Sequence, residues 1–325
     1  MSTDKKNFFR REWPLALKLA IVAGSLWFIY RQLAGKDDLD EFLSFYQTLS
    51  ADPFNRIVSG VVVILMAVNW WLEAYKWKVL VDKFENVSLL KAVRATLSGI
   101  TVSFFTPNRV GEFAGRIMHI SPQFRVMAML ATFIGSASQL LITVIFGLIG
   151  LAFFLPGFLS LDHNYFYLFL AGAVLISALL MNMFFHFGFL TKMLHHLKML
   201  HRFDKYLAVF EKYSTRELLA VFLYSGFRYI VFTFQFVILL KIMGVGLDLV
   251  FLFGLVTVVY LALTLFPTIF LTELPLRGSV AVYVIGQFSQ EHLAILCASF
   301  TIWLVNLVVP AVIGSLSVLY IRFTK

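Results

Sequence analysis

The chain has 325 residues, of which 60% are hydrophobic and 14% charged, whereas a soluble domain carries roughly 25% charged residues. Its apolar residues come in blocks of about 20, which is typical of transmembrane helices and excludes an ordinary soluble fold. The formal net charge is +9, but Lys and Arg lie mostly in short segments beside the apolar blocks, as the positive-inside bias requires. With no zinc-finger or RNA-binding signature in the chain, this distribution argues against a nucleic-acid partner.

The first apolar blocks place the N-terminus in the cytoplasm. Residues 1–13 contain four Lys and Arg, and the apolar run 14–34 is too long for a cleavable signal peptide, so we expect a retained first span. The next span, 57–81, returns inward and ends among Lys76 and Lys78, which are typical of the membrane interface.

A shorter apolar run follows and ends in a polar, Pro- and Gly-containing motif. If it crossed the membrane completely, Arg109 and Arg116 would lie outside, against the positive-inside bias. The pattern therefore predicts a hairpin over 89–121 that enters from the cytoplasm and turns between Pro107 and Gly111. Irregular backbone at that depth is tolerated only where it is buried in protein or lines a wet cavity.

The middle of the chain predicts two more spans and a basic surface segment. Spans 126–155 and 165–190 lead outward and back. Residues 191–216 carry six Lys and Arg with an apolar stripe, which predicts a cytoplasmic amphipathic segment on the anionic inner leaflet. Span 217–243 then leads outward again.

A second hairpin is predicted over 249–288, entering from the outside. Its apolar run is interrupted at Pro267 and again at Pro275, and we expect both prolines, like Pro107 and Gly111, to act as structural hinges. The last span, 292–321, ends at basic residues and places the C-terminus in the cytoplasm.

These elements predict one all-α polytopic membrane domain over 1–325, in the inner membrane of a bacterium. It has about six transmembrane helices and two oppositely oriented re-entrant hairpins. The halves 57–155 and 217–321 repeat one plan upside down, an inverted repeat of the kind that recurs in transporters.

Ionisable residues inside the predicted membrane domain are the candidate functional residues, because each costs about 2.5–3.5 kcal/mol on insertion scales. The set is Arg109, Glu112 and Arg116 in the first hairpin, Glu273 and Arg277 in the second, and Glu73 and Arg228 in full spans. Their charges leave a surplus of one cation. Arginine forks bind phosphate at two points, and broken helices aim N–H groups inward, so the set predicts a site for an anionic lipid head group.

Two alternatives to a ligand site are open at this stage. The first is internal ion pairing, with Glu112 paired to Arg109 or Arg116 and Glu273 paired to Arg277 at the i, i+4 spacing. The second concerns Glu73 alone, which lies close enough to the lysines at the span end to be an interface residue. Arg228 is about 15 Å into its helix, too deep to reach the interface easily, and is expected to face the bundle.

The sequence predicts neither an enzyme nor a metal or cofactor site. The adjacent His195 and His196 diverge on a helix, and no carboxylate or cysteine completes a metal-binding set with them and His201. The single cysteine, Cys297, lies in an apolar run and is expected to be inert. No Walker loop, G-x-S-x-G motif or catalytic triad is recognisable.

The segment from Gly99 to Arg116, with the core Pro-Asn-Arg-Val-Gly-Glu, resembles the lysylphosphatidylglycerol synthase/flippase membrane domain family. Glu73 in its Lys- and Trp-containing surroundings, and Arg228 in a late span, also fit this family, so the resemblance covers nearly the whole chain. The second hairpin departs from the family pattern, because Gly278 follows Arg277 where Glu is common. The resemblance implies lipid translocation, and the chain's end without an acyltransferase domain argues against aminoacyl-lipid synthesis.

The expected function is therefore that of a flippase-like transporter for an anionic lipid, either a phospholipid or a polyprenyl-phosphate carrier. Arg109, Arg116 and Arg228 would hold the head group, and Glu112 and Glu273 would orient the arginines or exchange a proton. The alternatives are a secondary transporter of a small anion and a non-transporting partner of a lipid-modifying enzyme. The sequence also leaves open a homo-oligomer and a lipid-synthesising partner enzyme.

Overall fold

The computed structural model describes residues 46–47, 51–104, 106, 109–159, 164–186, 209–266 and 270–319. The predicted first span, most of the basic segment (191–208), Pro107 and Pro267 lie outside the described residues. Over the described ranges, all regular secondary structure is helical, which confirms the predicted fold class.

Five helical stretches in the described ranges are long and apolar enough to cross a bilayer. They are α3 (Pro53–Val81), α6 (Arg125–Phe158, preceded by the 3-10 turn η2, Pro122–Phe124), α7 (Asn164–Phe185), α10 (Thr215–Ile242, preceded by the 3-10 turn η4, Phe210–Lys212) and the run α13–η5–α14 (His292–Trp303, Leu304–Val308 and Val309–Leu319). They correspond to five of the six predicted spans.

Two pairs of shorter helices occupy the positions of the predicted hairpins. The first pair is α4 (Leu89–Ser103) with α5 (Gly111–Ile117), and the second is α11 (Leu249–Thr264) with α12 (Phe270–Ile285). At 1.5 Å per residue, the 16 residues of α11 span about 24 Å, which is less than the roughly 30 Å hydrocarbon core of a bilayer. The members of each pair pack against one another.

Local sequence explains where several helices begin. Asp52 accepts a hydrogen bond from the Phe54 N–H, and Pro53 occupies the first helical position of α3. Ser214 and Glu217 form a reciprocal capping box at the start of α10. Asp248 caps α11 in the same way as Asp52 caps α3.

Helix α12 continues through Pro275, so this proline does not separate two helices, and its role as a hinge stays a prediction. The turn between α11 and α12 falls before Phe270, so the charged residues of the predicted second hairpin, Glu273 and Arg277, already lie in a helix. Pro275 is the sixth residue of α12 and so lies past the first turn, where its missing N–H removes one bond to the carbonyl four residues earlier. As a result Glu273 and Arg277 lie one turn apart on a single helix.

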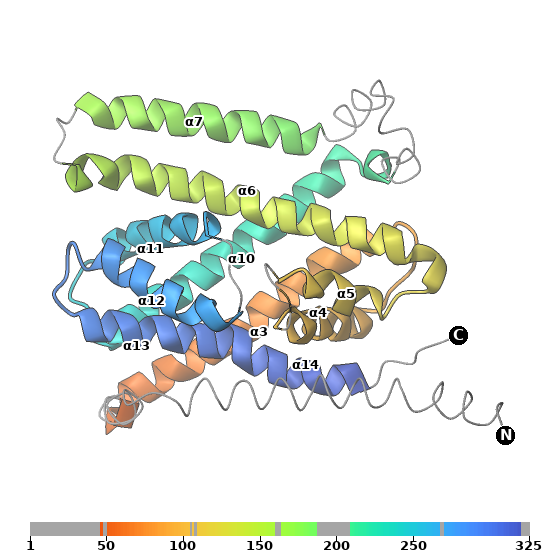
Figure 1. The fold of residues 1–325 in the computed structure, drawn as a ribbon, viewed down its shortest axis with the longest axis horizontal. Coiled ribbons are helices and arrows are strands. Elements are labelled where there is room, and N and C mark those ends of the chain that lie inside the picture. Colours follow the sequence, from red (N-terminus) through yellow and green to blue (C-terminus); the bar gives the residue numbers. More distant parts are fainter. Residues whose placement is uncertain are drawn as a thin grey trace.

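Helices α6, α7 and α13–α14 run lengthwise, α3 and α10 run obliquely to them, and the two short pairs lie toward opposite ends (Figure 1). Helices α6 and α7 lie side by side, while α3 and α10 cross the bundle and pack against one another. Helix α4 packs on α14, and α11 packs on α6. The ends of the two short pairs therefore approach each other near the middle of the bundle.

Candidate functional site

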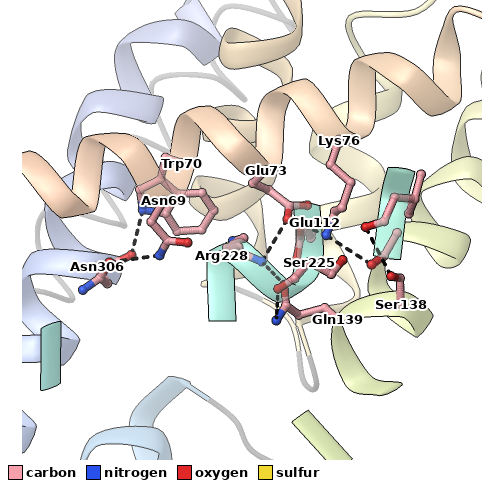
Figure 2. Close-up of polar contacts among 12 residues, drawn as sticks. Asn69, Trp70, Glu73, Lys76, Glu112, Ser138, Gln139, Ser225, Arg228 and Asn306 are labelled. Atoms are coloured by element: carbon pink, nitrogen blue, oxygen red, sulfur yellow. Dashed lines mark hydrogen bonds and ion pairs between the residues drawn. The ribbon is translucent and has the colours of Figure 1, made fainter. Parts of the chain in front are cut away.

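One face of α3 carries the central group of the site. Asn69, Glu73 and Lys76 are four and three residues apart, so they project from one face of the helix (Figure 2). Glu73 is 5% exposed, which places it inside the bundle and not at an interface. Its carboxylate forms ion pairs with three cations. The side-chain nitrogens of Lys76, Arg116 and Arg228 lie 2.7, 2.7 and 2.9 Å from its oxygens.

Arg116 links the first hairpin to α3. It projects from α5, is 2% exposed, and donates both to Glu73 and to Glu112 on its own helix. The predicted pairing of Glu112 with Arg116 is therefore confirmed. Arg116 pairs with Glu73 and Glu112 and is not among the residues that line the cavity described below, so we interpret its role as holding these two carboxylates in place.

Lys76 belongs to this cluster, and the sequence analysis missed it. It is 1% exposed, and its ammonium donates to the Gly135 carbonyl of α6 at 3.2 Å as well as pairing with Glu73. The i, i+3 spacing from Glu73 was the signal that could have identified it. With Lys76 included, the described cluster has five cations and three carboxylates, a surplus of two positive charges.

Arg228 projects from α10 toward the bundle interior, as expected. Its guanidinium donates to the Gln139 amide oxygen of α6 at 3.2 Å and lies 5.0 Å from the centre of the Trp70 ring (Figure 2). Together with its ion pair to Glu73, these contacts hold the guanidinium between three helices, α3, α6 and α10.

Glu273 joins the two hairpins. It is 5% exposed, and one of its oxygens accepts from Arg109 Nη2 at 2.5 Å and from Arg277 Nη2 at 2.8 Å. The pairing with Arg277 was predicted, whereas Arg109 pairs across the hairpins and not with Glu112. We refer to the Arg109–Glu273 ion pair below as the tip contact.

The turn that presents Arg109 is strained. Arg109 has a φ of 56°, and it is the one non-glycine residue with positive φ among those that the structure describes. Such backbone conformations cost on the order of 1–3 kcal/mol and cluster at functional sites. Immediately after it, the Gly111 N–H donates to the Thr106 hydroxyl at 2.6 Å and closes the turn.

A cavity of about 280 Å³ is lined by arginines that pair with Glu73 and with Glu273. Its described lining residues are three arginines, polar neutral residues, and aromatic and aliphatic residues: Arg109, Arg228, Arg277, Asn69, Gln139, Thr143, Thr264, Asn306, Trp70, Tyr229, Phe232, Tyr260, Leu263 and Leu307. Asn306 comes from η5, a π-helical turn, and such turns are frequent at functional sites. No carboxylate is among these described lining residues, so the wall is cationic while the carboxylates lie behind it.

Of the seven residues predicted for the site, the structure brings Arg109, Arg228 and Arg277 to the cavity wall. Of the other four, Glu73, Glu112 and Glu273 pair with these arginines or with the fourth residue, Arg116, and none of the four is among the described lining residues. Of the four predicted hinges, Gly111 lies at the start of α5, Pro275 lies within α12, and Pro107 and Pro267 lie outside the described residues.

Fold and site together define a multi-pass helical membrane protein with two short helix pairs that meet beside a cavity lined by three arginines. Residues 15–314 match the family described as the lysylphosphatidylglycerol synthase TM region, and the chain belongs to this family. A search of curated proteins finds no match to the chain.

Proposed function

We propose that this protein moves an anionic lipid between the leaflets of a bacterial inner membrane, without acting on it as an enzyme. The observation that carries the proposal is the division of charge at the cavity. Three guanidinium groups line it, whereas Glu73 and Glu273 neutralise them from behind. A guanidinium group can bind a phosphate through two parallel hydrogen bonds, and the net positive charge of the cluster favours an anionic ligand.

The size and surroundings of the cavity favour a lipid over a small soluble anion. A volume of about 280 Å³ is at the small end of ligand pockets and suits a head group better than a whole lipid. Beside the cavity, the ends of the hairpins expose Val110, Leu265 and Phe266 at 58%, 74% and 50%. Exposed apolar side chains at this position suit acyl chains that stay in the bilayer.

The tip contact gives the proposal a mechanism. A lipid phosphate that binds Arg109 competes with the Glu273 carboxylate for the same guanidinium. Binding then weakens the ion pair that joins the hairpins, and either hairpin end can move away from the other. Alternating separation on the two sides would pass the head group across the middle of the membrane while Arg228, held by three helices, stays in place.

The test is transport by purified protein in liposomes that contain tail-labelled phosphatidylglycerol. We expect Arg109→Ala to slow translocation at least about tenfold, because losing one phosphate-binding fork costs more than about 1.4 kcal/mol. Arg109→Lys should retain part of the rate, since it keeps the charge and loses the fork. Arg216→Ala, at an exposed site at the start of α10, is the matched control.

Other results separate the alternatives. Translocation by Arg109→Ala at the wild-type rate, in protein with wild-type thermal stability, would refute the proposed mechanism. Uptake of a small anion into liposomes without lipid movement would favour a secondary transporter. If the wild type moves neither lipid nor anion, a partner role beside a lipid-modifying enzyme is favoured.

A further inference from the structure

Lys76 is a buried cation of the cluster that is not among the described residues lining the cavity. We propose that Lys76 exchanges a proton, and that its charge changes as the lipid head group enters and leaves the cavity. The link to the head group rests on the proposed function, whereas proton exchange at Lys76 does not. The proposal is supported by the partners of the Lys76 ammonium and by a row of buried hydroxyl groups on α10.

The partners of Lys76 make it the member of the cluster that can change its charge. It pairs with Glu73, while Arg116 on α5 and Arg228 on α10 lie close enough to repel it, and α6 presents the Gly135 carbonyl. Arginine keeps its proton in proteins, whereas a buried lysine readily changes its protonation state. Protonation of Glu73, in contrast, would deprive both arginines of a shared carboxylate.

Proton exchange at Lys76 leaves the rest of the cluster paired. The ammonium gives one proton to a water molecule and becomes a neutral amine, which can still donate to the Gly135 carbonyl. Glu73 keeps its two arginine partners. The surplus charge of the described cluster falls from two to one, because five cations become four beside three carboxylates.

A row of buried hydroxyl groups runs along α10 from the level of this cluster. Ser225, Tyr229 and Thr233 are four residues apart, so they lie on one face of the helix, and they are 0%, 3% and 0% exposed. The Tyr229 and Thr233 hydroxyls face one another, yet none of the three makes a well-formed hydrogen bond. The buried hydroxyls of Thr132 and Thr301, in contrast, donate to the carbonyl four residues earlier. Buried polar groups without such a partner are sites where water binds.

This row connects Lys76 to the cavity. Lys76 and Ser225 contact the same turn of α6, residues 135–139, through the ammonium of one and the carbonyl of the other (Figure 2). One turn further along α10, Tyr229 lines the cavity. Thr233 lies eight residues after Ser225, about 12 Å toward the C-terminal end of α10. Water bound to these hydroxyls can carry a proton between Lys76, the cavity and that end of the bundle.

Head-group binding and protonation of Lys76 favour one another. A phosphate in the cavity brings a negative charge beside the cluster, which favours the ammonium over the neutral amine. By linkage, loss of the proton weakens phosphate binding by the same factor. A proton gradient can therefore drive release of the head group on the side where Lys76 loses its proton.

The first experiment measures proton exchange at Lys76 without any lipid substrate. Melting temperatures of wild type and Lys76→Arg are compared in detergent between about pH 6 and about pH 9, below the range in which ordinary lysines titrate. Because arginine keeps its charge throughout, we expect the difference between the two proteins to change by at least about 2 °C. Lys76→Met, which is neutral throughout, is the second variant and should also differ from wild type in a pH-dependent way.

Lys83→Arg is the matched control, because Lys83 is 32% exposed and pairs with Glu217. Its difference from wild type should stay constant over the same range. A constant difference for both Lys76 variants would overturn the proposal.

The second experiment measures the coupling in liposomes that contain tail-labelled phosphatidylglycerol and an enclosed pH indicator. We expect a gradient of about one pH unit, a tenfold ratio of proton activities, to change the wild-type translocation rate several-fold and to leave Lys76→Met unaffected. Thr233→Val removes a hydroxyl of the row at nearly constant volume and should slow proton entry several-fold. Thr301→Val is its control, because the Thr301 hydroxyl is bonded within its own helix. Equal proton entry in the two valine variants would overturn the route along α10.

The two experiments separate this proposal from the function on which its coupling rests. A pH-dependent melting difference in a protein that moves no lipid would refute the transport proposal and support proton exchange at Lys76. Lipid movement that responds to the gradient equally in wild type and Lys76→Met would support transport and refute the coupling.

Discussion

The Glu73 carboxylate shows how one side chain sets the charge of a buried site. Taking an ion out of water costs several kcal/mol, and only close, well-oriented partners offset this. Glu73 meets Lys76, Arg116 and Arg228 within 2.9 Å, so one anion offsets part of the burial cost of three cations. Because three cations share this one carboxylate, the group keeps a net positive charge beside the cavity.

Replacing Glu73 should therefore be far more damaging than replacing a peripheral carboxylate. We expect Glu73→Gln to reduce stability by about 3–5 kcal/mol, the usual result of removing one partner from a buried ion pair. Glu112→Gln is the control, because its side chain is 24% exposed and pairs with a single arginine, so its loss should be clearly smaller. Thermal unfolding of the purified proteins in detergent measures both. Equal melting temperatures for the two variants would contradict the central role of Glu73.

The residues of the site and its two i, i+4 ion pairs were largely predictable, but the ion pairs that join different helices were not. Arg109 and Glu273 stand out because each follows an interruption in an apolar run, where a charge is costly. Their contact joins positions 164 residues apart, and neither helical periodicity nor spacing reports on such a distance. Lys76 was missed for a different reason, since lysines close together at a span end have the same local pattern whether they are buried or at the interface.

At the scale of elements, the first hairpin depends on close backbone packing. A Cβ atom on Gly115 would lie 2.5 Å from the Ser98 carbonyl oxygen, and one on Gly111 would lie 2.4 Å from the Val102 carbonyl oxygen. Backbone atoms cannot move aside as a flexible side chain can. Glycine at these positions thus lets α5 lie directly on α4, which brings Arg116 to Glu73.

A methyl group at Gly115 should push α5 away from α4. We expect Gly115→Ala to destabilise the protein by about 1–3 kcal/mol, as overpacking of a tight interface does. Gly60→Ala on α3 is the matched control, because a Cβ there meets nothing within 4 Å and alanine favours the helix. Melting temperatures of the two variants give the comparison. A Gly115→Ala protein as stable as Gly60→Ala would show that the two helices separate without cost.

Element boundaries show what sequence patterns cannot decide. Apolar run lengths and charge placement predicted the short helix pairs, because a run too short to span a bilayer is visible in the sequence. The sequence pattern did not show whether a helix would continue through Pro275. A proline ends a helix or is tolerated within it according to where the helix begins, and here that depends on a turn some residues earlier.

At the scale of the whole molecule, the two halves repeat one order of elements. Each has a long helix, a short pair and another long stretch: α3, α4–α5 and α6 in the first half, and α10, α11–α12 and α13–α14 in the second. The short pairs lie at opposite ends of the long helices (Figure 1). Such an arrangement suits alternating access, because either end of the cavity can open while the other hairpin stays packed.

Charge distinguishes the two ends of the long helices. The end that holds the α3–α4 and α5–α6 connections is basic, with Lys78, Lys83, Lys91, Arg94, Arg125 and Arg216. The opposite end, with the starts of α3, α11 and α13, carries Asp52, Asp248 and Glu291 beside Arg56 and Lys241, so it has no excess of cations. Under the positive-inside bias we expect the basic end to face the cytoplasm.

Accessibility from the two sides of the membrane tests this orientation and the opposed hairpins together. Gln123 follows the first short pair and Gln290 follows the second, and both are exposed. In a Cys297→Ser background, which removes the native buried thiol, a membrane-impermeant thiol reagent on intact cells should label Gln290→Cys and spare Gln123→Cys until the membrane is opened. We expect this result because the sequence predicts that each short pair starts and ends on the same side of the membrane, which puts the connections after the two pairs on opposite sides. Labelling of both positions from outside would mean that the first pair crosses the bilayer, which would remove Arg109 from the membrane interior and with it the site proposed for the head group.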